Sequence, residues 1–289
     1  MLWGSVFPLA QVVMHHMSDI SLAIWRFALS TFGIGVYCII RKEHWPRLSP
    51  AAYLGLLILG VVGVGVFNIV FLGGLSQTSA TNGALIMSLS PAVTTLLSAL
   101  FALKIPEKKM MLSLLLSFIG VIVVITHGQA DVLLHMQFNH GDLYMFAAML
   151  TWSFYTLFSQ KMANYLSPLL LTFSTMLTGT LTLVVVSLYS HITPVHELLQ
   201  LSGSSLSLLV YIGLIATVLG YAFWVNGISK FGAPKASLFY NLLPVFAALM
   251  AYLLGQPLTS IQIAGMVIVL AGLSVSKFKW QPIKTSQST

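Results

Sequence analysis

Long apolar segments recur along the whole chain and are separated by short polar connections. Most of them reach the length of about 20 residues that a helix needs to cross the hydrocarbon core of a membrane. We therefore predict ten helices, the first of them shorter than a full span. Their expected ranges are 2–14, 18–40, 51–76, 79–103, 109–127, 142–163, 167–190, 205–229, 233–254 and 259–278.

Two of these apolar segments carry a proline near their centre, Pro91 in the fourth and Pro244 in the ninth. Proline removes one backbone donor and frees a carbonyl one turn back, which hydrocarbon tolerates only where protein or a watery cavity satisfies that carbonyl. We therefore expect helix breaks at both prolines, close to the middle of the membrane.

The two proline helices belong to an internal repeat. When Pro91 is laid on Pro244, glycine, serine and alanine positions around them also pair, and Trp3 through Gln11 aligns with Trp152 through Gln160. Each half then holds five helices, and because five is odd, the second half enters the membrane upside down. The sequence thus predicts an all-α integral membrane protein of ten transmembrane helices in two inverted five-helix repeats.

The expected domain boundaries follow from this repeat. We expect the first repeat at 1–127, an external connecting loop at 128–141, the second, inverted repeat at 142–278 and a cytoplasmic tail at 279–289. In the alignment Trp152 follows the start of its helix by ten residues, whereas Trp3 has two residues before it. We therefore expect the first helix to be truncated, with roughly ten residues of it missing upstream.

The basic residues indicate the orientation. In a ten-helix arrangement every Lys and Arg except Arg26 falls in connections on one side or in the C-terminal tail. Positively charged loops face the cytoplasm, so both termini are expected there. A missed or added helix would scatter these residues over both sides, which also favours ten helices.

Composition excludes several classes of protein. With 57% hydrophobic and 7% charged residues, the chain is far more apolar than a soluble domain. The net charge of +7 is spread over loops and forms no basic helix face, so we expect no nucleic-acid partner. Cys38 is the single cysteine, which leaves no intrachain disulfide and no thiolate metal site. His127, Asp131 and His135 have a helical spacing that could ligate a metal, but an external polar loop explains them as well, and we predict no metal or cofactor.

The substrate site is expected near the bilayer midplane between the repeats, where the interrupted helices meet. The candidates combine aromatic faces with amide and hydroxyl groups, which suits an amphipathic metabolite such as an amino acid. Against this stands the alternative that such residues form interfacial belts or join helices. The candidate binding residues are Trp3, Asn68, Phe71, Ser88, Trp152, Tyr221, Trp224, Tyr240 and Asn241.

Arg26 is the only charge well inside a predicted helix, about 12 Å from its outer end. An arginine there costs several kcal/mol unless it is paired or hydrated. It could pair with a substrate carboxylate or phosphate, or it could hold helix carbonyls or reach outward to the interface. No acidic residue is expected at mid-membrane, so we favour facilitated transport or exchange over proton coupling through a buried carboxylate.

Several of these residues carry a family likeness. Trp3-Gly4-Ser5, Trp25-Arg26-Phe27, the small residues before Pro91 and the segment from Pro244 to Thr259 resemble the EamA-type transporters of the drug/metabolite transporter superfamily. The resemblance implies a ten-helix carrier of the bacterial inner membrane that commonly exports amino acids or other small metabolites through a cavity between its halves. Gln256 departs from the glutamate that is usual in that family, so we assign the loop no role.

Together these observations predict a secondary transporter that moves a small amphipathic metabolite by alternating access, with export favoured. The alternatives are a non-transporting receptor or assembly subunit, and an importer of a nucleotide-like or other anionic metabolite. An enzyme is not expected, because no nucleophile with a base and no ligand cluster falls at one depth. The expected partners are a small molecule and the lipid bilayer, and the protein would be a monomer or a homodimer.

Overall fold

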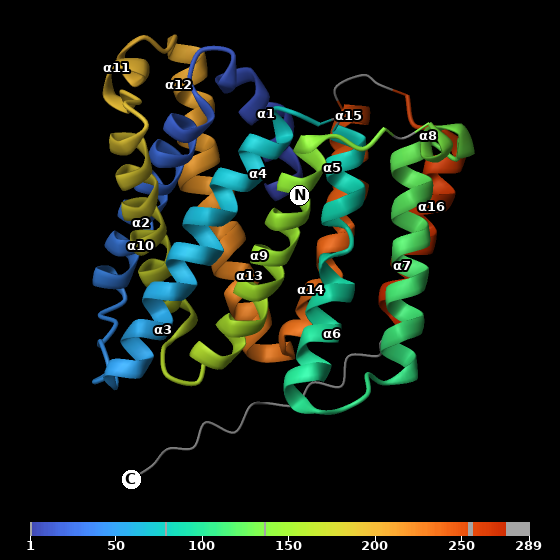
Figure 1. Cartoon of the computed structure of the whole chain (residues 1–289), viewed down its shortest axis with the longest axis horizontal. Coiled ribbons are helices and arrows are strands. Elements are labelled where there is room, and N and C mark those ends of the chain that lie inside the picture. Colours follow the sequence, from blue (N-terminus) through green and yellow to red (C-terminus); the bar gives the residue numbers. More distant parts are fainter. Residues whose placement is uncertain (1, 79, 136, 254–256, 276–289) are drawn as a thin grey trace.

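In the computed structural model, the described residues 2–78, 80–135, 137–253 and 257–275 form a bundle whose main helices run up and down side by side (Figure 1). This part of the chain is helical and contains no strand. Up to residue 134 the elements are α1 (Leu2–Met14), α2 (Asp19–Ile40), α3 (Pro50–Gly60), η1 (Val61–Val66), α4 (Phe67–Leu75), α5 (Ala80–Met87), α6 (Ser90–Ala102), α7 (Lys108–Thr126) and α8 (Ala130–Leu134). From residue 140 they are α9 (His140–Met162), α10 (Pro168–Tyr189), α11 (Pro194–Leu199), α12 (Gly203–Val210), η2 (Tyr211–Thr217), α13 (Val218–Phe231), α14 (Ala233–Leu238), η3 (Phe239–Leu242), α15 (Leu243–Leu253) and α16 (Ser260–Val275).

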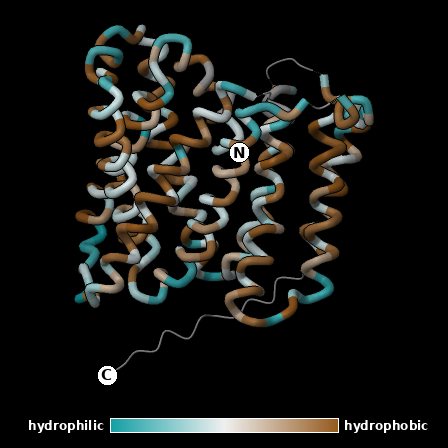
Figure 2. The backbone as a smooth tube through the Cα atoms, viewed as in Figure 1, coloured by the Kyte–Doolittle hydropathy of each residue, from teal (hydrophilic) through white to brown (hydrophobic). Residues whose placement is uncertain are grey.

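Six helical segments of the described chain are long and apolar enough to cross a membrane. They are Asp19–Ile40, Pro50–Leu75, Asn82–Ala102, Lys108–Thr126, Pro168–Tyr189 and Gly203–Phe231. Figure 2 shows hydrophobic residues along the body of the bundle, with hydrophilic residues concentrated at its two ends. The structure is therefore that of an all-helical, multi-pass membrane protein. Gln256, the expected end of the last helix at 276–278 and the tail at 279–289 lie outside the described residues.

Serine side chains fix where several of the long helices begin. Ser18, Ser49, Ser167 and Ser202 each precede a helix and accept a hydrogen bond from the backbone N–H three residues later. Such caps satisfy one of the backbone donors that a helix start leaves without an intrahelical partner. They explain why these helices start within three residues of the positions expected from hydrophobicity.

Both proline-containing segments are interrupted in the structure. α5 ends at Met87 and α6 begins at Ser90, with Pro91 in its first turn. The missing N–H of Pro91 leaves the Met87 carbonyl without its helical donor, and the Ser90 hydroxyl donates to that carbonyl at 2.7 Å. In the second segment the helix tightens to the 3₁₀ turn η3, and Pro244 follows at the start of α15.

Two further irregularities were not expected from the sequence. The segments η1 and η2 are π-helical turns inside otherwise continuous spans. Such turns carry one extra residue, which rotates the helix that follows relative to the helix before it. They therefore set the direction in which α4 and α13 present their aromatic side chains.

Small residues allow the closest helix contacts in the bundle. A Cβ added to Gly60 of α3 would lie 2.8 Å from the Thr175 carbonyl oxygen of α10, so these backbones are nearly in contact. Gly120 of α7 and Gly265 of α16 meet in the same way. α7 and α16 stand together at one side of the bundle, whereas the largest hydrophobic cluster surrounds α9.

Candidate functional site

A cavity of about 60 Å³ lies inside the bundle and is lined by residues of α1, α2, α4, α9, η2, α13, η3 and α15. Aliphatic side chains and one arginine, Arg26, complete its wall. Its aromatic lining consists of Trp3, Phe67, Phe71, Trp152, Tyr221 and Tyr240. Segments that are more than 140 residues apart in the sequence therefore build one largely apolar chamber.

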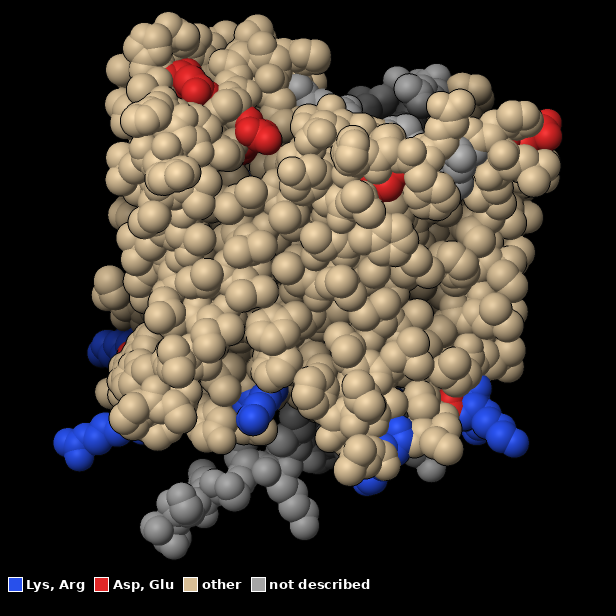
Figure 3. All heavy atoms as spheres, viewed as in Figure 1, with Lys and Arg blue, Asp and Glu red and all other residues tan. Residues whose placement is uncertain are grey.

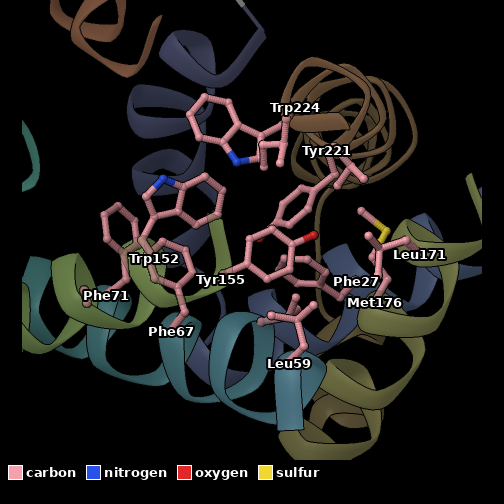
Figure 4. Packing of buried hydrophobic residues seen from close by; sticks show 14 of the residues in the cluster. Phe27, Leu59, Phe67, Phe71, Trp152, Tyr155, Leu171, Met176, Tyr221 and Trp224 are labelled. Carbon is pink, nitrogen blue, oxygen red and sulfur yellow. The ribbon is translucent and has the colours of Figure 1, made fainter. Parts of the chain in front are cut away.

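Trp152 of α9 is the centre of the aromatic cluster (Figure 4). Its ring centroid lies between 5.1 and 5.9 Å from six other rings, those of Trp3, Phe67, Tyr155, Tyr221, Trp224 and Tyr240. Edge-on and tilted arrangements predominate, and aromatic rings prefer these to a face-to-face stack. A planar or apolar part of a small molecule would meet ring faces and edges on several sides here.

Two indole groups in this cluster lack a hydrogen-bond acceptor. The Nε1 atoms of Trp3 and Trp224 are buried and have no partner within the described part of the chain. A buried unpaired donor costs about 1–3 kcal/mol. These two N–H groups are therefore donors without acceptors, on side chains that line the cavity or the groove.

A groove of about 430 Å³ continues from the cavity along α13. Trp3 and Tyr240 line both spaces, and Trp224 lines the groove. Gly220 and Gly227 form its floor on α13. The groove is lined by apolar and aromatic side chains and so extends the aromatic surface toward one end of the bundle.

Six of the nine candidate binding residues lie on these two spaces: Trp3, Phe71, Trp152, Tyr221, Trp224 and Tyr240. The other three line neither of them. Asn68 donates to the Val64 carbonyl of its own helix at 2.7 Å, and Ser88 donates to the Leu85 carbonyl at 2.6 Å. Asn241 is buried, and its side-chain oxygen has no partner among the described residues.

Phe67 lines the cavity and was not among the candidates. Its position one helical turn before Phe71 is the signal that could have identified it, because residues four apart share a helix face. The rings of Phe67 and Phe71 are stacked with centroids 5.4 Å apart.

Acidic residues do not line the cavity or the groove. No group of three metal-ligating side chains is found within the ranges that the structure describes. His127 ends α7 in a left-handed conformation, and α8 begins at Ala130, so His127, Asp131 and His135 do not share one helix face. The helical spacing on which the metal-binding alternative rested is therefore absent at these residues.

Comparison with known proteins identifies the family to which the chain belongs. The family model described as "EamA-like transporter family" matches residues 1–126 and again residues 139–277. The chain belongs to the EamA-like transporter family. It is thus a transporter of the drug/metabolite transporter superfamily, as the resemblance predicted, and the family implies a small-molecule substrate and a membrane location.

Relatives of this EamA-like transporter are described as transporters too. The uncharacterized transporter YyaM of Bacillus subtilis (strain 168) is 33% identical over 273 residues, which cover 93% of this chain and 88% of that protein. A probable amino-acid metabolite efflux pump of Salmonella typhimurium is 26% identical over 297 residues, covering 99% and 94% of the two chains. A solved crystal structure superposes with a TM-score of 0.77 at 15% identity, covering 96% of this chain and 93% of the other, which shows a shared fold.

Proposed function

We propose that this protein is a secondary transporter that moves a small amphipathic metabolite, an amino acid or a derivative of one, by alternating access. The observation that carries the proposal is the aromatic cavity between helices from both ends of the chain, with two unpaired indole N–H groups in its cluster. Cavities that are mostly apolar with a few polar groups suit such molecules. Export is favoured, because similar proteins of Salmonella typhimurium and Escherichia coli are described as probable amino-acid metabolite efflux pumps.

We further propose that the helices form two inverted five-helix repeats, at 1–127 and 142–278. Residues that the alignment makes equivalent meet each other, as expected at a twofold axis. Trp3 and Trp152 are equivalent, and their rings lie 5.3 Å apart. Thr31 and Thr180, which have the same separation in sequence, are hydrogen-bonded at 3.2 Å.

Equivalent helix contacts support the same repeat. Gly60 packs on Thr175 and Thr178 of α10. Its counterpart Gly213 packs on Arg26 and Leu29 of α2, and these are the counterparts of the two threonines. The same contact thus occurs twice, through three pairs of equivalent residues, which chance packing does not explain.

Both termini are proposed to face the cytoplasm of a bacterial inner membrane. On the face drawn in Figure 3, Lys and Arg lie along one end of the molecule, and most of the visible acidic groups lie toward the other. Cysteines placed at Asn139 and at Lys235 in a Cys38→Ser background test this arrangement. An impermeant maleimide added to intact cells should label position 139 and leave position 235 unlabelled, and the reverse pattern would overturn the orientation.

Flux measurements test the transport function. Purified protein in proteoliposomes preloaded with unlabelled amino acids should accumulate labelled amino acid by counterflow, and empty vesicles should not. Folded protein that gives no counterflow with any amino acid or derivative would favour the alternative of a receptor or assembly subunit.

A further inference from the structure

Arg26 lines the cavity from α2, and its backbone is fixed by neighbouring contacts. The Ser30 Oγ lies 2.7 Å from both the Arg26 and the Gly213 carbonyl oxygens, so its one hydrogen is shared between the two acceptors and ties α2 to η2. The guanidinium carbon lies 5.0 Å from the ring centroid of Phe27. Arg26 is therefore held at the cavity wall by its surroundings.

The π-helical turn η2 orients the guanidinium itself. The Thr217 hydroxyl donates to the Ile212 carbonyl, five residues earlier, at 2.7 Å. With its hydrogen committed there, the Thr217 oxygen accepts a hydrogen bond from Nε of Arg26, also at 2.7 Å. This contact uses one edge of the guanidinium and leaves its two terminal amino groups available for a ligand. An arginine presents such groups in a planar fork that matches a carboxylate.

No acidic side chain pairs with Arg26 in the described part of the chain, and none lines the cavity. A charge inside the membrane is costly unless something offsets it. Here its neighbours within the protein are neutral: the Thr217 hydroxyl, the Phe27 ring and the Tyr221 phenol, which interacts electrostatically with the guanidinium. The chamber therefore carries one uncompensated positive charge, which complements a ligand with one negative charge.

The two halves of the molecule differ at this point. In the alignment Arg26 corresponds to Thr175, and Val6 corresponds to Tyr155. Tyr155 is fully buried, and its hydroxyl lies 3.4 Å from the Thr175 hydroxyl, so that half is filled by side chains. Val6 lines the cavity and has no ring to fill the equivalent space in front of Arg26. The open space and the positive charge thus coincide in one half only.

We propose that Arg26, oriented by Thr217, binds the carboxylate of the substrate, while the aromatic cluster around Trp152 holds a planar or apolar body. The substrate class is thus a monocarboxylate with an aromatic or similarly flat side group. This assignment rests on the transport function proposed above and names the substrate chemistry of the same site. A phosphate dianion fits less well, because the cavity provides a single cation for two charges.

A matched pair of ligands tests the carboxylate. Phenylacetate and phenylacetamide have the same ring and nearly the same shape but differ in charge, and neither absorbs at the wavelength that excites tryptophan. Quenching of tryptophan fluorescence in the purified full-length protein reports binding of each. We expect the wild type to bind phenylacetate at least about tenfold more tightly than phenylacetamide, since hydrogen bonds between charged groups are worth roughly 1.4 kcal/mol or more.

Single substitutions test which side chains cause the preference for phenylacetate over phenylacetamide. Arg26→Gln should bring the ratio of the two affinities close to one by weakening only the acid, and Arg26→Lys should lower the ratio because an ammonium lacks the planar fork. Thr217→Val should weaken phenylacetate several-fold without changing phenylacetamide, and Thr217→Ser should restore it. Lys161→Gln, which removes a charge away from the cavity, is the control and should leave the ratio unchanged.

The outcomes separate this inference from the transport function. No binding of phenylacetate to folded wild-type protein, equal affinities for acid and amide, or a ratio unchanged by Arg26→Lys would each overturn the carboxylate site. Binding of the amide serves as the test that each variant is folded, and if Arg26→Gln fails it, Arg26→Lys and Thr217→Val decide the question. Acid-selective binding without flux would instead refute transport and leave the binding site standing.

Discussion

The contact between Gly60 and α10 gives the sharpest test of the packing. A Cβ added at Gly60 would lie 2.8 Å from the Thr175 carbonyl oxygen and 2.9 Å from the Thr178 Cβ. A backbone carbonyl cannot rotate away as a side-chain end can, so Gly60→Ala must push α3 and α10 apart. Overpacking of this kind costs about 1–3 kcal/mol.

A second glycine in a helix, without close neighbours, serves as the control that separates the cost of overpacking from other effects. Replacing glycine by alanine inside a helix also gains roughly 0.5–1 kcal/mol, because alanine has fewer unfolded conformations to lose. Gly227 in α13 has no atom within 4 Å of its added Cβ, so Gly227→Ala should show the gain alone. The difference in stability between the two variants is therefore the overpacking term, about 1–3 kcal/mol.

Thermal unfolding of the purified protein in detergent, followed by circular dichroism, measures that difference. At about 2–4 °C per kcal/mol for a chain of this size, Gly60→Ala should unfold about 2–12 °C below Gly227→Ala. Gly213→Ala, whose added Cβ would lie 2.9 Å from the Leu29 Cβ, should behave like Gly60→Ala. If Gly60→Ala were as stable as Gly227→Ala, the close approach of α3 and α10 would be refuted.

Three further outcomes are expected. Trp152→Phe should lower substrate affinity by about twofold to tenfold in counterflow assays, since aromatic pairs contribute roughly 0.5–1.5 kcal/mol, while Trp45→Phe outside the cavity should not. Asn241→Ala should leave affinity within about twofold, because Asn241 lines neither the cavity nor the groove; a larger loss would show that it reaches the substrate. A double-mutant cycle of Thr31→Val and Thr180→Val should give a coupling near 0.6 kcal/mol, and no coupling would contradict the hydrogen bond between them.

Much of the fold follows from local features of the sequence. Hydrophobic length identifies the six helical segments of the described chain that are long and apolar enough to cross a membrane. Serines such as Ser18 and Ser167 mark where such helices start, because the cap lies directly before the apolar segment. The interruption before Pro91 is also a local property, since the proline removes the same donor in any context. These features depend on neighbours within a few residues, and they were predictable for that reason.

The π-helical turns could not be predicted in the same way. η1 contains only valine and glycine, and in η2 the residue type of Thr217 does not reveal that its hydroxyl will bond to the Ile212 carbonyl five residues earlier. Both turns lie where their span packs closely on another helix: Gly60, directly before η1, meets α10, and Gly213, inside η2, meets α2. Their position is set by tertiary packing, which the sequence of one segment does not contain.

The candidate site was also predictable only in part. Aromatic residues such as Trp152 and Tyr221 were predicted from residue type and depth, and the structure places them on the cavity. Asn68 and Ser88 also had the right type and depth, but their side chains donate to carbonyls of their own helices. Short polar side chains can bond locally in this way, although Asn68 Oδ1 has no partner among the described residues, so polarity alone does not show that a side chain faces a ligand.

The asymmetry between the halves explains why a repeat alone does not locate a substrate site. Two perfectly equivalent halves would offer two identical chambers, one symmetric chamber on the axis between them, or none. Here Tyr155 fills one position, and its counterpart Val6 leaves the other open beside Arg26. In the proposed arrangement the repeat supplies the scaffold, and the positions at which its halves differ supply the chemistry. Exchanging the residues tests this view: Val6→Tyr should close the chamber and abolish phenylacetate binding while the protein stays folded.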